Sequence, residues 1–300
     1  MSLGVVIKGP EGIVLAADSR VTLQARTATS QLLPISFDNA TKLLAFSKHR
    51  FVGAVTYGQA VIGKRTAHSF LPEFEVGLGD ARLSVQNFAA KLGEFFLARW
   101  NDSNMPKDYD GPPMTFVVAG FDEGQPYGEV FVVDVPRQTK PQRRTPAAEF
   151  GMTWGGQLDI ASRIVGGFDP ALPKQLASAS GRPIEEVNQW LLQCSPALQL
   201  PIPYEFLPLQ DCISLATAMI RTTMVFQDTA IRVRGVGGPV DIAVITRTRG
   251  LVFVQRKKLR GEMGYALSGG EDDAPCSDHD SELVSSKRPA APRRVARARR

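Results

Sequence analysis

The stretch SLGVVIKGPEGIVLAADSR, residues 2–20, contains two short apolar runs joined by the turn Gly-Pro-Glu-Gly. Apolar runs that are rich in β-branched residues and bounded by Gly and Pro predict a β-hairpin. A second hairpin is predicted near the other end, where GGPVDIAVITR (237–247) is followed by LVFVQ (251–255). These two hairpins carry the strongest information about the fold, and the first one places residue 2 at the start of a strand.

The segments between the two hairpins predict further strands and a series of helices. The patterns predict strands at 42–46, 51–55, 115–121 and 129–133, and helices at 59–70, 82–100, 158–165, 184–194 and 209–226. In the second helix, Phe88, Leu92 and Phe96 recur at helical spacing, which is typical of a face packed against a sheet. Strand pairs followed by blocks of helices favour two packed antiparallel sheets with helices outside over a parallel βαβ sheet. We therefore expect an α+β fold, a four-layer αββα sandwich.

The positive charge of the chain belongs to its last residues. The sequence has 35 Lys and Arg against 30 Asp and Glu, and seven of the 35 lie in KRPAAPRRVARARR (287–300), which leaves 28 basic against 30 acidic residues. A nearly neutral remainder does not favour a nucleic-acid-binding domain. Residues 258–300 are rich in Ser, Gly, Asp, Pro and Arg, a composition that cannot bury enough apolar surface to fold. We expect a folded domain over 1–257 and a disordered, low-complexity tail with a basic C-terminus over 258–300.

The cysteines and the apolar runs indicate a cytoplasmic protein without a membrane span. Cys194, Cys212 and Cys276 are scattered and form no CxxC pair, which is typical of reduced thiols. No apolar run approaches the roughly 18 residues that a membrane span needs, and the first eighteen residues contain charges that a signal peptide excludes. His49 and His68 lack partners at metal-ligand spacing, so we expect no metal site.

Ser2 offers an unusual combination of reactive groups. Removal of Met1 would leave a hydroxyl and a free α-amine on this one residue. The ordinary pKa of an α-amine is about 7.7–8.0, so a good part of it is neutral near physiological pH and can take the hydroxyl proton. A nearby ammonium lowers the pKa of the amine, and a carboxylate can orient that ammonium. Asp18 ends the second predicted strand and Lys42 begins the third, so both can lie beside Ser2.

The same segments resemble those of the proteasome β-subunits, of the bacterial 20S type. GIVLAADSR (12–20) is similar to their GVVLAADSR segment, and GGPVDIAVITR to their GG-x-x-DVAVITR segment. TKLL (41–44) matches the stretch that holds the catalytic Lys of the family, while FVVAGFD (116–122) and VFVVD (130–134) resemble two of its central strands. The resemblance extends over about residues 2–255. It implies an N-terminal nucleophile (Ntn) hydrolase fold.

Residue by residue, the resemblance assigns a catalytic group. Ser2 takes the place of the nucleophile, Asp18 and Lys42 those of the catalytic carboxylate and ammonium, and Arg20 that of a supporting Arg. An early backbone N–H of the AVTYG segment (54–58), with Thr56 favoured, takes the place of the oxyanion donor, which needs no particular side chain. Nothing in the resemblance calls for a metal or a cofactor.

Three departures from the family accompany these matches. Ser2 replaces the Thr of the family and lacks the methyl group that restricts χ1. Trp154 occupies the position of a catalytic Ser in a GSG turn, unless Thr153 supplies the hydroxyl. The second Asp of the family has only Asp228 as a nearby candidate, and that match needs an insertion.

The resemblance implies a self-compartmentalising peptidase subunit that acts on peptides or unfolded proteins. A homo-oligomeric ring and an ATP-dependent unfoldase are the partners that it suggests. The departures leave two alternatives open, a non-catalytic ring subunit and an Ntn amidase that acts on small molecules.

Overall fold

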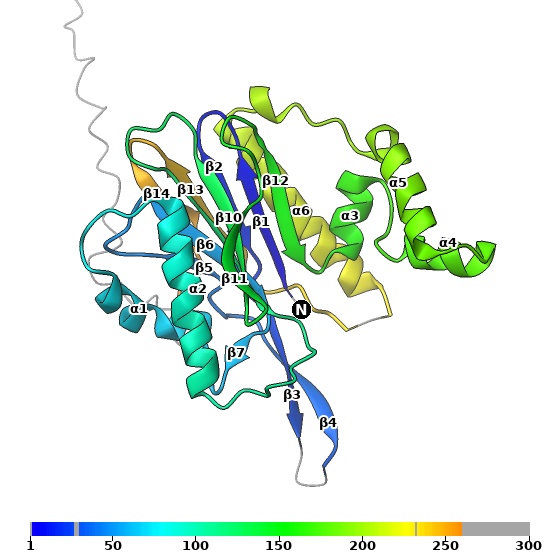
Figure 1. Cartoon of the computed structure of the whole chain (residues 1–300), viewed down its shortest axis with the longest axis horizontal. Helices are drawn as coiled ribbons and strands as arrows, with labels where there is room; N and C mark the ends of the chain where they lie inside the picture. The colour runs from blue at the N-terminus through cyan, green and yellow to red at the C-terminus, as the bar shows by residue number, and fades with distance from the viewer. Residues whose placement is uncertain (1, 27–29, 232, 260–300) are drawn as a thin grey trace, which may run out of the picture. The chain divides into compact units, whose positions relative to one another are not determined.

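Two five-stranded antiparallel sheets form the centre of the computed structural model, which describes residues 2–26, 30–231 and 233–259 (Figure 1). The first sheet contains, from edge to edge, β12 (Gly151–Gly156), β1 (Leu3–Lys8), β2 (Ile13–Ala17), β13 (Asp241–Thr246) and β14 (Gly250–Gln255). The second contains β11 (Gln138–Arg143), β10 (Glu129–Val135), β9 (Met114–Gly120), β6 (Val52–Gly58) and β5 (Leu43–Ala45). Both predicted hairpins lie in the first sheet, where β2 pairs with β13.

Helices and two small hairpins complete the described part of the chain. The helices are α1 (Leu71–Leu78), α2 (Val85–Asp102), α3 (Asp159–Gly166), α4 (Leu172–Ser180), α5 (Ile184–Leu198) and α6 (Leu209–Thr229), with 3-10 turns η1 (Ala67–Phe70) and η2 (Tyr204–Phe206). Helices α1 and α2 cover the outer face of the second sheet and α3 and α6 that of the first, whereas α4 and α5 stand to the side (Figure 1). The hairpins are β3 (Val21–Arg26) with β4 (Leu32–Phe37), and β7 (Val61–Ile62) with β8 (Arg65–Thr66). Figure 1 shows the β3–β4 hairpin projecting from the body of the domain.

Three hydrophobic clusters hold the four layers together. One lies between the sheets and contains Leu15 and Val117. A second joins the second sheet to α1 and α2, and the predicted Phe stripe of α2 belongs to it. The third joins the first sheet to α3 and α6, through residues such as Leu3 and Ile220. The expected αββα sandwich is thus confirmed, because each sheet has one face toward its partner and one toward helices.

Strand β1 shows how this arrangement arises from the sequence. All six of its residues are buried, because side chains alternate between the two faces of a strand and both faces are covered here. Leu3, Val5 and Ile7 pack toward the helices, whereas Val6 packs between the sheets. A strand buried on both faces reads as a continuous apolar run. By the same alternation, the Ser2 side chain lies on the inner face.

The prediction of a helix at residues 59–70 is wrong. This segment contains β7, β8 and the turn η1, and the first α-helix begins only at Leu71. Gly58 and Gly63 have left-handed φ angles of 87° and 59°, which residues with a Cβ rarely adopt, and they interrupt the helical pattern. Pro72, by contrast, stands in the first turn of α1, where its missing N–H costs no hydrogen bond.

The other predicted elements are present with bounds that differ by a few residues, and the structure also contains elements that were not predicted. Helix α5 continues through Pro196 to Leu198. The β3–β4 hairpin, β11, β12 and α4 have no counterpart in the prediction, and the residues read as a GSG-like turn lie in β12. The expected tail falls, apart from its first two residues, outside the described part of the chain.

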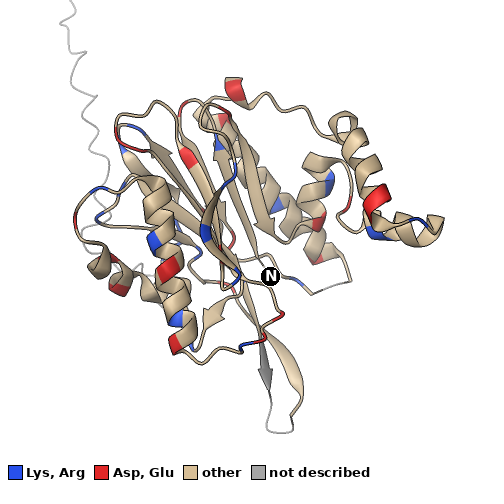
Figure 2. Ribbon diagram, in the orientation of Figure 1, with Lys and Arg blue, Asp and Glu red and all other residues tan. Residues whose placement is uncertain are grey.

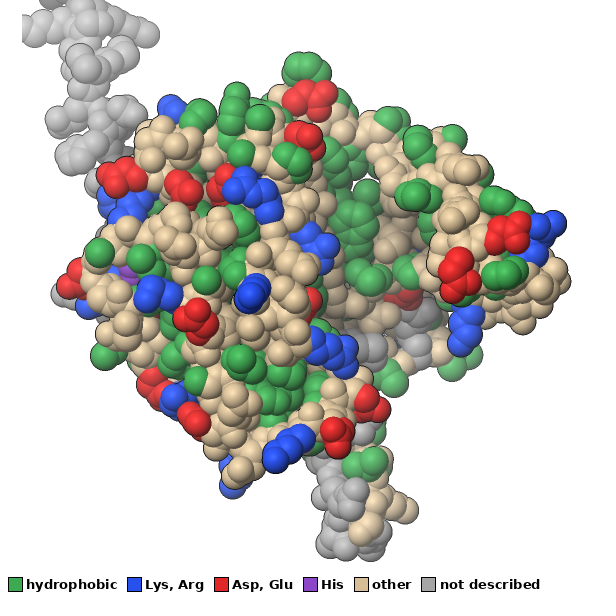
Figure 3. All heavy atoms as spheres, viewed as in Figure 1, with side chains coloured by type: hydrophobic (Ala, Val, Ile, Leu, Met, Phe, Trp, Pro, Cys, Tyr) green, Lys and Arg blue, Asp and Glu red, His purple; other side chains and the backbone are tan. Residues whose placement is uncertain are grey.

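The face of the domain seen in Figures 2 and 3 carries mixed charges and a marked hollow. In Figure 2, acidic and basic positions alternate along α2 instead of gathering with one sign. Figure 3 shows a hollow between the main body and the segment that carries α4 and α5, with apolar side chains inside it. A cavity of about 460 Å³ lies beside β12, lined among others by Met152, Trp154 and Leu158.

Of the helices that the structure describes, none has the length and apolar character to cross a membrane.

Candidate active site

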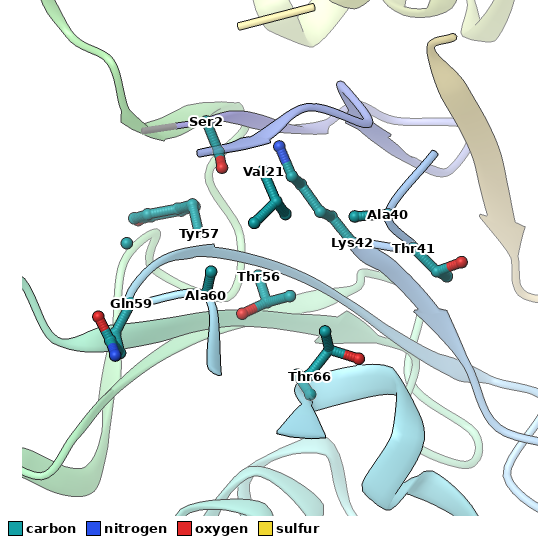
Figure 4. A pocket seen from close by; sticks show the side chains of 12 residues that line it. Ser2, Val21, Ala40, Thr41, Lys42, Thr56, Tyr57, Gln59, Ala60 and Thr66 are labelled. Carbon is teal, nitrogen blue, oxygen red and sulfur yellow. The ribbon is translucent and has the colours of Figure 1, made fainter. Parts of the chain in front are cut away.

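A small cavity brings Ser2 and Lys42 together. Ser2 stands directly before β1 and Lys42 directly before β5, and Figure 4 shows the Lys42 side chain extending toward the strand that follows Ser2. The cavity holds about 20 Å³ and is also lined by Val21, Thr56 and Gly58. This volume accommodates about one water molecule. Ser2 is 5% exposed and Lys42 is 4% exposed, so both meet in a nearly closed space.

Asp18 is the centre of the hydrogen-bond network behind this cavity. Its Oδ1 accepts from Lys42 Nζ over 2.7 Å and from the Leu3 N–H over 2.9 Å. Its Oδ2 accepts from the N–H groups of Arg20 and Gly237, over 3.1 and 3.0 Å. The residue is 1% exposed, and a buried carboxylate needs such partners to offset the loss of water. Asp18 therefore ties together the start of β1, the lysine and the C-terminal hairpin.

Lys42 is held as a hydrogen-bonded ammonium in a poorly solvated place. Its Nζ donates to Asp18 and also to the carbonyl oxygen of Arg20. Burial lowers the pKa of Lys42 below its ordinary value, and Lys257 and Arg20 act in the same direction, whereas Asp18 raises it. A charge in this position lowers the pKa of a neighbouring amine. The arrangement can thus tune an α-amine on Ser2 toward its proton-accepting form.

The segments GIVLAADSR (12–20) and GGPVDIAVITR (237–247) contact each other at Arg20. Its guanidinium makes a bidentate contact with Asp38, with distances of 2.6 Å for Nε–Oδ1 and 2.9 Å for Nη2–Oδ2. A Cβ on Gly237 would lie 2.5 Å from the Arg20 Cζ, and a Cβ on Gly238, whose φ is 71°, would lie 2.2 Å from the Asp38 carbonyl oxygen. The Gly-Gly pair is therefore needed because backbone passes directly against the Arg20–Asp38 pair.

Asp38 and Gly237 are site residues that the sequence reasoning missed. Asp38 lies between β4 and β5, in a stretch for which no structure was predicted. The Arg20 guanidinium, by its hydrogen bonds, lowers the pKa of Asp38 below its ordinary value. A carboxylate close in sequence to Lys42 was a signal that could have identified Asp38. The Gly-Gly pair was recognised only as part of a motif, without its contact to Asp18.

Thr56 does not fit its predicted part as oxyanion donor in this structure. Its backbone N–H donates to the carbonyl oxygen of Lys42 over 2.9 Å, because pairing between β5 and β6 extends one residue beyond β5. Backbone N–H groups alternate between the two edges of a strand, so the next one on this edge belongs to Gly58. Gly58 lines the same cavity as Ser2.

Asp228 and Thr153, the substitutes for two missing family groups, do not line the cavity of Ser2, although the charge of Asp228 acts on Arg20. Asp228 stands near the exposed end of α6, where its carboxylate faces Arg234 over 3.6 Å. Trp154 pairs in register with Val5 and packs toward the helices. Thr153 pairs with Val6, four residues along β1 from Ser2. Thr153 does not line the cavity of Ser2, so its hydroxyl does not replace that of the family's Ser.

Metal ions need sets of ligand side chains that lie close together. Among residues 2–26, 30–231 and 233–259, no three His, Cys, Asp or Glu side chains are grouped so that they could hold a metal ion. His49 packs edge-on against Phe88 in the hydrophobic core. This contact is typical of a structural histidine.

Comparison with known proteins gives a structural match only. No protein-family model matches the chain, and no curated protein matches its sequence. Among solved structures, it is similar to a Gly-1 mutant of Anbu from Hyphomicrobium sp. strain MC1, with a TM-score of 0.51. The match covers 86% of each chain at 12% sequence identity.

The chain has a proteasome-like Ntn-hydrolase fold. The resemblance noticed in the sequence motifs is therefore confirmed for the fold. At 12% identity the likeness concerns the arrangement of the sheets and helices.

Proposed function

We propose that this chain is a peptidase subunit of the Ntn class, with Ser2 as its nucleophile after removal of Met1. The observation that carries the proposal is the cavity that Ser2 shares with the Lys42 ammonium, which Asp18 holds by a 2.7 Å hydrogen bond. A hydroxyl, an α-amine and an oriented ammonium are the groups that this type of catalysis requires. The substrate class, a peptide or an unfolded protein, follows from the family resemblance.

In the proposed reaction, the α-amine of Ser2 takes the proton from the hydroxyl as Oγ attacks the carbonyl carbon of a peptide bond. The C–N bond then breaks, the proton passes to the leaving amine, and an acyl ester remains on Ser2. Water attacks this ester and releases the acid, with the α-amine again acting as the base. The Gly58 N–H is our candidate to stabilise the oxyanion, since the N–H of Thr56 is already bonded to Lys42.

Two alternatives remain of interest. A non-catalytic ring subunit is favoured by the engaged N–H of Thr56 and by the lack of a hydroxyl from β12 near Ser2. A small-molecule Ntn amidase on the same scaffold is the second alternative. A homo-oligomeric ring and an ATP-dependent unfoldase partner belong to the proposal by family resemblance alone.

Hydrolysis assays separate the three possibilities. The chain without Met1 is expected to cleave fluorogenic peptides, and Ser2→Ala is expected to abolish cleavage without lowering the melting temperature. Cleavage of small acyl amides but not of peptides would favour the amidase. No turnover of either substrate, together with ring assembly, would favour the non-catalytic subunit.

A further inference from the structure

A second buried ion pair, between Lys257 and Asp241, lies beside the loop that begins with Asp18 after β2. The two side chains are only 9% and 4% exposed. Asp241 begins β13 and pairs in register with Ala17, the residue before Asp18. Lys257 follows β14, and its backbone N–H donates to the Asp241 carboxylate over 2.8 Å. The pair thus belongs to the C-terminal hairpin but lies next to the loop that begins with Asp18.

Ser19 connects this second ion pair to the first. Its hydroxyl is hydrogen-bonded to Lys257 Nζ over 3.0 Å, and the residue is fully buried. The backbone of Ser19 is fixed as well, because its N–H donates to the Gly237 carbonyl and its own carbonyl accepts from the Ala40 N–H. Asp18 and Ser19 are consecutive, so one dipeptide is bonded to Lys42 through the first side chain and to Lys257 through the second.

We propose that Lys257 is a positioning residue for the Asp18–Lys42 pair: it holds the Asp18–Ser19 backbone through the Ser19 hydroxyl, and its positive charge opposes the charged form of Lys42. The part of this inference that concerns turnover rests on the proposed function. Lys257 does not line the cavity that contains Ser2. Its effect on chemistry therefore has to pass through the Asp18–Ser19 dipeptide and through the electrostatic potential at Lys42.

The charges around Lys42 make this effect measurable. The charged groups that act on it are Asp18, Lys257, Arg20 and Asp38, and in the chain without Met1 the α-amine of Ser2 lies in the same cavity. Burial is the main reason that the pKa of Lys42 is lowered, and Lys257 adds to the lowering. Loss of the Lys257 charge should therefore raise the pKa of Lys42. A purely structural role for Lys257, as an anchor for the end of β14, predicts no such change while the chain stays folded.

The test compares Lys257→Gln with Lys258→Gln. Lys258 is the next residue and is exposed, so the control removes the same charge outside the buried pair. The titration of Lys42 Nζ is followed by NMR in the parent and in both variants. We expect it to move to higher pH by about half a unit or more in Lys257→Gln, and to stay unchanged in Lys258→Gln. An unchanged Lys42 titration in a folded Lys257→Gln chain overturns the inference.

Two further variants keep the test decisive if Lys257→Gln fails to fold. Lys257→Arg retains the charge and is expected to preserve the Lys42 titration. Ser19→Ala retains both ion pairs and removes only the connecting hydroxyl. It should lower kcat about three- to tenfold, with KM changed by less than about twofold. A Ser19→Ala chain with the kcat of the parent would remove the support for positioning through Ser19.

The NMR measurement also separates this inference from the proposed function. If no chain hydrolyses a peptide and Ser2 takes up no electrophile, the peptidase proposal fails. The titration of Lys42 would still show whether Lys257 acts on it, because this titration needs no substrate.

Discussion

Replacement of Gly237 by Ala tests whether the segment GGPVDIAVITR (237–247) and the segment GIVLAADSR (12–20) depend on each other. A Cβ at this position would lie 2.5 Å from Arg20 Cζ and 2.7 Å from Nε, well inside normal contact distance. The Arg20 guanidinium cannot retreat freely, because two hydrogen bonds attach it to Asp38. The N–H of Gly237 also holds Asp18. The substitution should therefore disturb the hydrogen-bond network of Asp18 and not only the hairpin.

The expected cost follows from these contacts. Overpacking of a close contact costs about 1–3 kcal/mol, and the partly exposed Arg20–Asp38 pair adds little to this range. A loss of about 2 kcal/mol corresponds to a fall in Tm of roughly 4–8 °C for a domain of this size. Thermal unfolding followed by circular dichroism measures the shift, and peptide hydrolysis should fall at least tenfold because Asp18 loses its position.

Gly77→Ala is the matched control for this experiment. Gly77 lies in α1, and a Cβ there would meet no atom within 4 Å. Alanine in a helix is favoured over glycine by roughly 0.5–1 kcal/mol, so the control should keep or raise the Tm. A Gly237→Ala chain that melts and hydrolyses like the parent would refute the close-contact reasoning.

Three other outcomes are expected. Lys42→Ala should reduce peptide hydrolysis by about two orders of magnitude or more and lower the Tm, because the buried Asp18 loses its charged partner; parent-like initial rates would exclude a role for Lys42. The pH–rate profile should be bell-shaped. The rate should rise as the Ser2 amine loses its proton, at a pH at or below its ordinary pKa of about 7.7–8.0. The rate should fall as the Lys42 ammonium loses its proton, at a pH below the ordinary pKa of 10.5, because burial lowers the pKa of Lys42. An alkaline limb above pH 10.5 would contradict this assignment. A chain that ends at Leu259 should keep the oligomer size and hydrolysis rate of the full chain, as measured by size-exclusion chromatography and peptide cleavage, and dissociation would place the missing residues in an interface.

The layers of the fold were predictable because both faces of the sheets are buried. Continuous apolar runs such as GIVLAA and DIAVIT indicate strands with two covered faces, and the Phe stripe of α2 indicates the helix that covers one of them. The edge strands were not predictable in the same way. In β11, the residues Gln138–Arg143 are half-buried or exposed and polar, so their place in the sheet depends on pairing with β10 and not on an apolar pattern.

The candidate site was predictable as far as side chains define it. Asp18 and Lys42 were expected beside the start of β1, and the structure joins them by a hydrogen bond there. The contacts that depend on backbone geometry were not predictable. A count of residues along the sequence favoured Thr56 as oxyanion donor, but strand pairing between β5 and β6 decides which N–H groups are free. The contact between Gly237 and Asp18 spans 219 residues and needs the completed sheet.

Intact-mass analysis of the natively produced chain, combined with labelling by a peptide epoxyketone, tests the central claim most directly. The probe requires both the hydroxyl and the free amine of Ser2. We predict a chain that lacks Met1 and takes up one probe molecule at Ser2, with no uptake by Ser2→Ala. Retention of Met1, or peptide hydrolysis that survives Ser2→Ala, would contradict the assignment of Ser2 as the nucleophile.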